Sequence, residues 1–243
     1  MKNLLTRIFT NIKFRQAIAT FLKGILAGFC IVLCTALYVV VSTYSNKFWG
    51  GMVFPMGMLI ILNFGYFLYT GKVCYLFDHL KRTSNLHYWL QVFIGLIGNL
   101  VGTIGLGLVL SYIFDKVPAF QGENGVVTTI VGYANELVDF KLSRGLPMAF
   151  VLGVVCNILI YFATEGFAKI ENVFVKHLVV YATISAFVLL GLEHCIATTF
   201  YLAFARVCSL DAVLFVIMVA LGNAVGGNMI PLTVKLIKRL ERR

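Results

Sequence analysis

Apolar runs of about 20 residues recur along the chain, and they restrict its fold more than any other feature. An α-helix needs a run of about this length to cross a hydrocarbon core roughly 30 Å thick. Charged residues make up only 12% of the chain, against roughly 25% in soluble domains. The sequence therefore predicts one all-α integral membrane domain over residues 1–243. The six predicted spans are residues 19–42, 51–79, 86–114, 145–164, 174–205 and 210–234.

The basic residues are unevenly distributed between the two sides of these spans. With the N-terminus in the cytoplasm, fourteen Lys and Arg residues fall in cytoplasmic segments and five in external ones, namely Lys47, Lys116, Lys141, Arg144 and Arg206. Because cytoplasmic connections carry an excess of Lys and Arg, we expect a multi-pass protein of the inner cell membrane with both termini in the cytoplasm. Residues 1–18 are expected as an amphipathic cytoplasmic segment, and residues 235–243 as a basic tail. This topology accounts for the net charge of +10, so no nucleic-acid partner is expected.

An internal repeat links the two halves of the chain. The motif "GNLVG" of the third span returns as "GNAVG" in the sixth, 124 residues later. At a similar offset "LAGFCIVL" of the first span lies against "VLGVVCNIL" of the fourth, which pairs Gly28 with Gly153. Each half has three spans, so the second half enters the membrane from the opposite side. Inverted repeats of this kind are typical of channels and transporters, although such glycines also serve close helix packing alone.

The second and fifth spans are expected to be broken at matching places, "GYFLYTGK" at residues 65–72 and "GLEHC" at residues 191–195. A break inside a membrane frees backbone N–H and C=O groups, which are tolerated only where protein or a wet cavity satisfies them. The half-helix that begins at a break presents free N–H groups and a partial positive charge. Two such ends converging from opposite halves would attract an anion.

Glu193 and His194 lie in the second of these breaks, where ionisable groups are costly and therefore point to function. Desolvation disfavours the charged form of His194, which makes it a neutral donor or a proton source for an anion. Protonating the anion would remove the large cost of its lost hydration. Glu193 is expected to cap or brace the broken helix by accepting freed N–H groups. The competing interpretation of His194 is a structural histidine bonded to backbone.

The six cysteines form no CxxC pair, and the four histidines have no metal-ligand spacing. We therefore expect no metal and no cofactor. A membrane enzyme that uses His194 and Glu193 as acid and base is a further alternative, but no second catalytic cluster accompanies them, so we expect no catalytic residues and no enzyme. An alternative function is a neutral small-solute channel of the aquaporin type. Such channels carry Asn-Pro-Ala boxes at both breaks, and this sequence has none.

The sequence resembles the formate/nitrite transporter family over essentially all six spans. "GLEHCIA" (residues 191–197) resembles the family signature Gly-x-Glu-His-x-Ile-Ala, "LGNAVGGN" (residues 221–228) its last-helix motif, and "LYTGK" (residues 68–72) its first broken helix. The resemblance implies an aquaporin-like bundle in the lipid bilayer, assembled as a homopentamer with one pore per subunit. It also implies passage of small monovalent anions or their conjugate acids, such as formate, nitrite or hydrosulfide.

The resemblance also assigns roles to single residues. His194 would be the central pore histidine and Thr70 the threonine of the mobile loop, while Lys141 and Asn157 match a vestibule lysine and a buried asparagine. The apolar constrictions would be formed by Phe54, Met58, Leu68, Ile160 and Phe187. The sequence departs from the family pattern at Phe67, where an acidic residue is usual, at Lys72, where a neutral polar residue is commoner, and at Met58, where leucine is usual.

Three of these polar residues have two interpretations each. Lys141 either raises the anion concentration at a pore mouth or is an interfacial lysine whose head snorkels to water. Asn157 lines the pore or makes a hydrogen bond between helices. Lys72 adds positive charge near the pore or snorkels towards the cytoplasm.

The predicted topology is testable by labelling. Residues 115–144 are predicted to be an external loop. A cysteine introduced at position 123 of this loop should react with a membrane-impermeant thiol reagent applied to intact cells, because the distribution of basic residues places the loop outside. Labelling only after the membrane is opened would contradict the topology.

Overall fold

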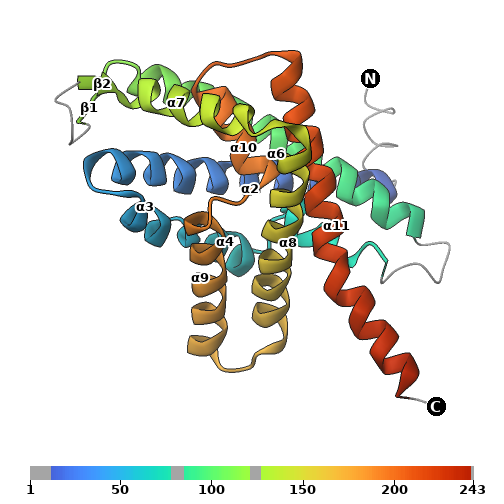
Figure 1. Ribbon diagram of the computed structural model, residues 1–243. Coiled ribbons are helices and arrows are strands. Elements are labelled where there is room, and N and C mark those ends of the chain that lie inside the picture. The colour runs from blue at the N-terminus through green and yellow to red at the C-terminus, as the bar shows by residue number, and fades with distance from the viewer. Residues whose placement is uncertain (1–11, 78–84, 121–126, 242–243) are drawn as a thin grey trace, which may run out of the picture.

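The computed structural model describes residues 12–77, 85–120 and 127–241, which form helices and one short β-hairpin (Figure 1). Position 123 and residues 1–11 of the predicted N-terminal segment lie outside the described residues. The elements are α2 (Ile12–Tyr44), α3 (Lys47–Val53), α4 (Pro55–Phe64), α5 (Tyr69–Lys72), the 3-10 turn η1 (Val73–Tyr75), α6 (Asn85–Phe114), β1 (Pro118–Phe120), β2 (Val127–Thr129), α7 (Ile130–Ser143), α8 (Gly145–Lys169), α9 (Val173–Leu189), α10 (Cys195–Phe204) and α11 (Leu210–Leu240).

Within the described residues, five helical segments are long and apolar enough to cross a membrane: α2, α3 with α4, α6, α8 and α11. The segment predicted as the fifth span consists of two shorter apolar helices, α9 and α10. Residues 235–240 of the predicted basic tail continue α11 as exposed helix. The all-helical architecture with several apolar spans is therefore present.

Both expected helix interruptions are present, and each begins with a glycine. Gly65 follows α4 with φ of 65°, and Gly191 follows α9 with the same φ. This left-handed conformation suits glycine, which has no Cβ to clash with the backbone. The chain then runs without helix to Leu68 in the first break and to His194 in the second, before α5 and α10 begin.

Two long helix pairs form the frame of the bundle: α2 packs along α6, and α8 packs along α11. Glycines permit the close approach, because a Cβ built on Gly24 would lie 3.1 Å from Cα of Gly98, and one on Gly153 would lie 3.3 Å from Cα of Gly222. Gly98 and Gly222 are the first glycines of the two repeated motifs, so the residue that corresponds to Gly153 in the first half is Gly24. The predicted pairing of Gly153 with Gly28 was therefore wrong by one helical turn.

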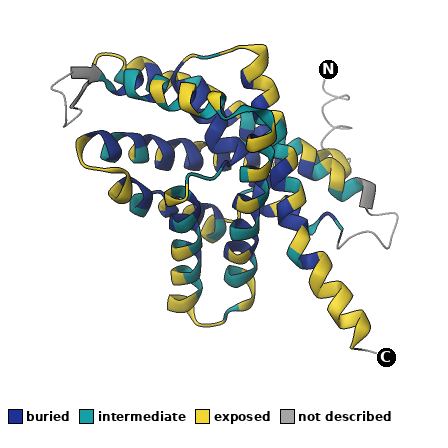
Figure 2. Cartoon of the chain, in the orientation of Figure 1, coloured by how far each residue is buried: buried dark blue, intermediate teal, exposed yellow. Residues whose placement is uncertain are grey.

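Large apolar side chains cover the outer faces of the long helices, as expected where helices meet lipid or another subunit. Examples are Leu33 on α2, Phe93 on α6, Val151 on α8 and Leu221 on α11. Buried residues concentrate where α2, α6, α8, α10 and α11 meet (Figure 2).

The segment of residues 115–144 was expected to be a loop, and it is instead largely structured. It contains β1, β2 and the 14-residue helix α7, whose N-cap Thr129 accepts a hydrogen bond from the N–H of Gly132. Lys141 therefore lies in the last turn of α7.

Glycine packing in α6 gives a stability prediction with a control in the same helix. A Cβ on Gly102 would lie 2.5 Å from the carbonyl oxygen of Ile25, whereas a Cβ on Gly105 meets no atom within 4 Å. We expect Gly102→Ala to destabilise the protein by about 1–3 kcal/mol through overpacking. Gly105→Ala should be neutral or slightly stabilising, because alanine is the better helix former. Thermal unfolding of purified protein in detergent would measure both, and equal midpoints would contradict the prediction.

Candidate functional site

Asn99 of α6 supplies hydrogen bonds to the first break. Its Oδ1 accepts from the N–H of Tyr69 at 2.8 Å, and its Nδ2 donates to the carbonyl oxygens of Phe67 and Gly24, each at 2.8 Å. Tyr69 is the first residue of α5, so one side chain satisfies backbone groups on both sides of the helix start. The side chain is fully buried.

Asn223 of α11 supplies the corresponding hydrogen bonds to the second break. Its Oδ1 accepts from the N–H of Cys195 at 3.0 Å, and its Nδ2 donates to the carbonyl oxygens of Glu193 at 3.0 Å and Gly153 at 2.8 Å. Asn99 and Asn223 are the asparagines of the GNLVG and GNAVG motifs. The partners therefore correspond one by one, Tyr69 with Cys195, Phe67 with Glu193 and Gly24 with Gly153.

His194 lies at the N-terminus of α10 and joins the two breaks. Its Nδ1 accepts from the N–H of Ala197 at 3.2 Å, and its Nε2 lies 2.9 Å from Oγ1 of Thr70 in α5. A neutral His194 whose Nδ1 is an acceptor carries its proton on Nε2, so it donates to Thr70. The Thr70 hydroxyl proton is then available for another acceptor. The imidazole stacks on Phe187, with ring centroids 6.0 Å apart and planes at 18°.

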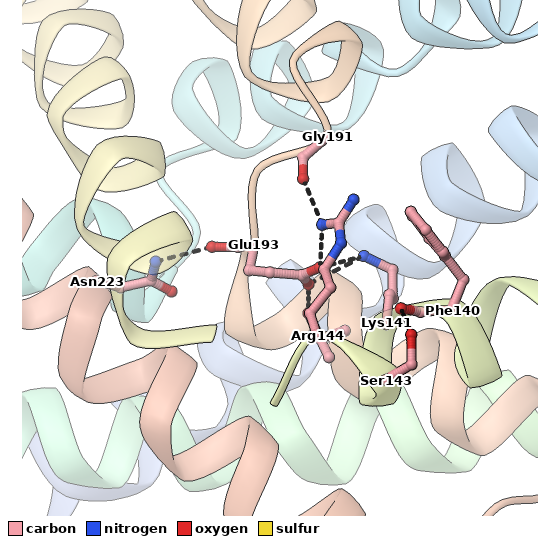
Figure 3. Close-up of polar contacts among 8 residues, drawn as sticks. Phe140, Lys141, Ser143, Arg144, Gly191, Glu193 and Asn223 are labelled. Atoms are coloured by element: carbon pink, nitrogen blue, oxygen red, sulfur yellow. Dashed lines mark hydrogen bonds and ion pairs between the residues drawn. The ribbon is translucent and has the colours of Figure 1, made fainter. Parts of the chain in front are cut away.

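Glu193 has side-chain partners, contrary to the expectation that it accepts freed backbone N–H groups. Its fully buried carboxylate accepts hydrogen bonds from Nζ of Lys141 at 2.8 and 2.9 Å (Figure 3). It also accepts one from the hydroxyl of Thr198 at 2.8 Å. His194, rather than Glu193, caps α10. Lys141 is thus an ion-pair partner of a buried acid and not a snorkelling interfacial lysine.

Arg144, at the junction of α7 and α8, adds a second positive charge to this cluster. Its Nη1 donates to the carbonyl oxygen of Gly191 at 3.0 Å and lies 3.5 Å from the Glu193 carboxylate (Figure 3). Two cations therefore face one carboxylate. The cluster keeps a surplus positive charge, although Glu193 balances one lysine.

One cavity is lined by His194, and a second is lined by Leu68 and Gly71, which lie on either side of Thr70 in the chain. The first, here named the Lys141 cavity, has a volume of about 300 Å³ and is lined by Phe54, Lys141, Arg144, Phe187, His194 and Tyr201, among others. The second, here named the Lys72 cavity, has a volume of about 410 Å³ and is lined by Met58, Leu68, Lys72, Tyr75, Thr164 and Glu165, among others. Phe54 is edge-on to Phe187, with ring centroids 5.5 Å apart.

The predicted constriction residues and Asn157 lie at the following places in the structure. Phe54 and Phe187 are buried beside the Lys141 cavity, and Met58 and Leu68 beside the Lys72 cavity. Ile160 is buried in the same core but lines neither cavity. Nδ2 of Asn157 donates to the carbonyl oxygen of Thr70 at 3.0 Å, so α8 bonds to the first break.

Sequence reasoning missed Asn99, Asn223, Arg144 and Thr198. The two asparagines had a visible signal, since each stands between glycines in the repeated motif, but only the glycines of that motif were interpreted. Arg144 was counted as an external charge, and its position within reach of Gly191 depends on how α7 folds back. Thr198 lies within one turn of Cys195 on a helix whose orientation the sequence does not give.

This fold and site define an all-helical, multi-pass membrane protein of the channel and transporter class. The formate/nitrite transporter family model matches residues 7–237. The chain belongs to the formate/nitrite transporter family.

Relatives and solved structures agree with this membership. The chain is 28% identical to the "Formate channel FocA" of Haemophilus influenzae, over 76% of this chain and 66% of that protein. It is 29% identical to "Formate-nitrite transporter 2" of Toxoplasma gondii, over 89% of this chain and 49% of that protein. The matches thus span less than two thirds of either relative. A "Pentameric formate channel with formate bound" superposes with a TM-score of 0.73 at 25% identity, covering 94% of this chain and 98% of that one.

The buried ion pair gives a prediction about stability. Lys141→Ala should destabilise the protein by about 3–5 kcal/mol, because removing one partner leaves Glu193 buried and undercompensated. The double variant Lys141→Gln/Glu193→Gln should recover much of this loss, since the fully buried carboxylate is no longer charged. Thermal unfolding in detergent would measure the free-energy differences.

Lys47→Ala is the matched control, because Lys47 lines the same cavity but is exposed. It should change stability by no more than about 0.5 kcal/mol. A Lys141→Ala variant as stable as wild type, or a double variant less stable than the single one, would show that the pair does not act as described.

Proposed function

We propose that this chain is a channel or transporter for small monovalent anions or their conjugate weak acids, such as formate, nitrite or hydrosulfide. The observation that carries the proposal is the buried His194–Thr70 pair. His194 lines the Lys141 cavity, Thr70 is flanked by Gly71 of the Lys72 cavity, and both cavities contain basic side chains. The names of the relatives, formate channels and formate-nitrite transporters, support the same substrate class. The positive charge at the cavities does not favour a neutral solute.

The proposed path begins with attraction of an anion into the Lys141 cavity by the surplus charge of Lys141 and Arg144. Phe54 and Phe187 then oppose a bare anion, because their apolar surface does not replace its hydration. The Thr70 hydroxyl, freed by its bond from His194, donates to the anion at this point. A proton from water in the cavity reaches the anion through the Thr70 hydroxyl, which gives up one proton as it receives another, so Thr70 and His194 stay neutral. The neutral acid that forms meets Met58 and Leu68 at lower cost.

We also infer that the two halves are inverted three-span repeats, with the second and fifth spans broken. The support is the matched sets of bonds around Asn99 and Asn223, together with the glycines of equal φ that begin both breaks. A pseudo-two-fold axis in the membrane plane would bring the starts of α5 and α10 together near the midplane, as the Thr70–His194 contact requires.

The assembly and placement that follow are part of the same proposal. Residues 1–243 would form one channel domain in the inner cell membrane, with both termini in the cytoplasm. A homopentamer is proposed from the likeness to the pentameric formate channel and from the exposed apolar faces of the long helices. Part of each face would contact lipid and part a neighbouring subunit.

Flux measurements test the proposal. Proteoliposomes carrying the purified protein should pass formate, nitrite or hydrosulfide faster than chloride, since chloride is not protonated near neutral pH and so cannot cross as a neutral acid. His194→Asn should change the ratio of fluxes among these anions by about tenfold, about the effect of one hydrogen bond, because the Thr70 hydroxyl is no longer oriented toward the anion. It should also change the pH dependence of flux, because the Thr70 hydroxyl that passes the solvent proton to the anion loses its partner His194.

His177→Asn is the matched control, because His177 is bonded to Asn63 on the surface and lines neither cavity. It should leave selectivity and pH dependence unchanged. Wild-type protein that passes no anion would overturn the proposal. A correctly assembled His194→Asn protein with wild-type selectivity and pH dependence would make His194 a structural residue.

A further inference from the structure

Lys72 occupies a distinctive position at the mouth of the Lys72 cavity. It is the last residue of α5, its side chain is exposed, and it lines this cavity together with Leu68 and Met58. Its ammonium lies 5.9 Å from the centroid of the Phe67 ring. Lys72 thus stands on the side of the proposed apolar constriction opposite to Lys141.

The two breaks differ in charge at corresponding positions. Phe67 corresponds to Glu193, since their carbonyl oxygens accept from Asn99 and Asn223 respectively. Five residues further on, Lys72 corresponds to Thr198. In the second break the acid Glu193 balances Lys141. In the first break the counterpart of Glu193 is the uncharged Phe67, so no acid at position 67 balances Lys72.

A second lysine lies close by. An adjoining cavity of about 540 Å³ is lined by Lys23, Lys72, Phe67, Tyr88 and Gln91, among others. Its lining, as far as the described chain shows, includes no carboxylate. In the Lys72 cavity the carboxylate of Glu165 is bonded to the Tyr75 hydroxyl at 2.8 Å and paired with Lys169 at 2.5 Å. Within residues 12–77, 85–120 and 127–241, no carboxylate lies within 4.0 Å of the ammonium of Lys72 or Lys23.

We propose that Lys72 and Lys23 form a second anion-collecting site, which holds the small monovalent anion at the Lys72 face of the protein before it passes Leu68 and Met58. This inference rests on the proposed function, because the ligand is the permeant anion. Positive groups in a cavity with apolar walls raise the local anion concentration. Salt in the solution on that face screens them over a Debye length of about 8 Å.

The test changes ionic strength on one face at a time. Right-side-out and inverted membrane vesicles expose opposite faces to the medium, and potassium gluconate raises the ionic strength there. For wild type, formate flux should fall as gluconate is raised on either face. Lys72→Gln should lower flux at low salt about threefold to fivefold, the scale of one ionic contact near water, and should weaken the salt dependence on the Lys72 face only.

Companion variants separate charge from structure. Lys72→Arg keeps the charge and should retain the salt dependence on both faces. Arg144→Gln should weaken the dependence on the opposite face alone. Lys238→Gln, at an exposed position on the last turns of α11 that lines none of these cavities, should behave as wild type.

The results distinguish this inference from the proposed function. A wild-type flux that does not respond to salt on the Lys72 face overturns the collecting site while leaving the anion pathway intact. So does a Lys72→Gln protein that matches wild type in flux and in salt dependence, with flux expressed per assembled protein. Wild-type vesicles with no anion flux at all would overturn the proposed function and this inference with it.

Discussion

The architecture depends on satisfying backbone groups where two helices break inside an apolar bundle. Lipid offers no hydrogen-bonding partner, so each freed N–H or C=O needs one from the protein. Asn99 and Asn223 provide them, each accepting from the first residue of a half-helix and donating to a carbonyl of the preceding break. These bonds hold Thr70 and His194 where their side chains meet. The central pair therefore rests on two residues that do not touch it.

A second constraint is the buried carboxylate of Glu193. A charge in a low-dielectric interior needs a partner, and Lys141 and Arg144 come from the end of α7 to supply it. Because two cations meet one acid, the same cluster that compensates Glu193 leaves positive charge at a cavity. Stability and the proposed anion attraction thus have one physical origin at this face, whereas the opposite face has lysines without an acid at the matching position.

Sequence reasoning succeeded where a short motif carries its own physics. The apolar runs identified the spans, and the glycines of residues 65 and 191 marked the breaks, because a left-handed residue favours glycine. Sequence reasoning failed where two residues fit an alignment equally well, and where the contacting residues are far apart in the chain. Gly28 and Gly24 lie one turn apart on the same helix face, so a letter alignment does not separate them. The polar stretch that forms α7 was interpreted as a loop, which hid the partner of Glu193, 52 residues away in the chain.

The sequence by itself determined the membrane class, the family and the presence of Glu193 and His194 in a broken apolar span, because these follow from composition, run length and local motifs. Tertiary structure decided what those residues do to each other. It placed Nε2 of His194 2.9 Å from Thr70, 124 residues earlier, and gave the capping of α10 to His194 rather than to Glu193. Such pairings depend on which helix faces meet, and a helix face is fixed by packing against several neighbours at once rather than by any local stretch of residues.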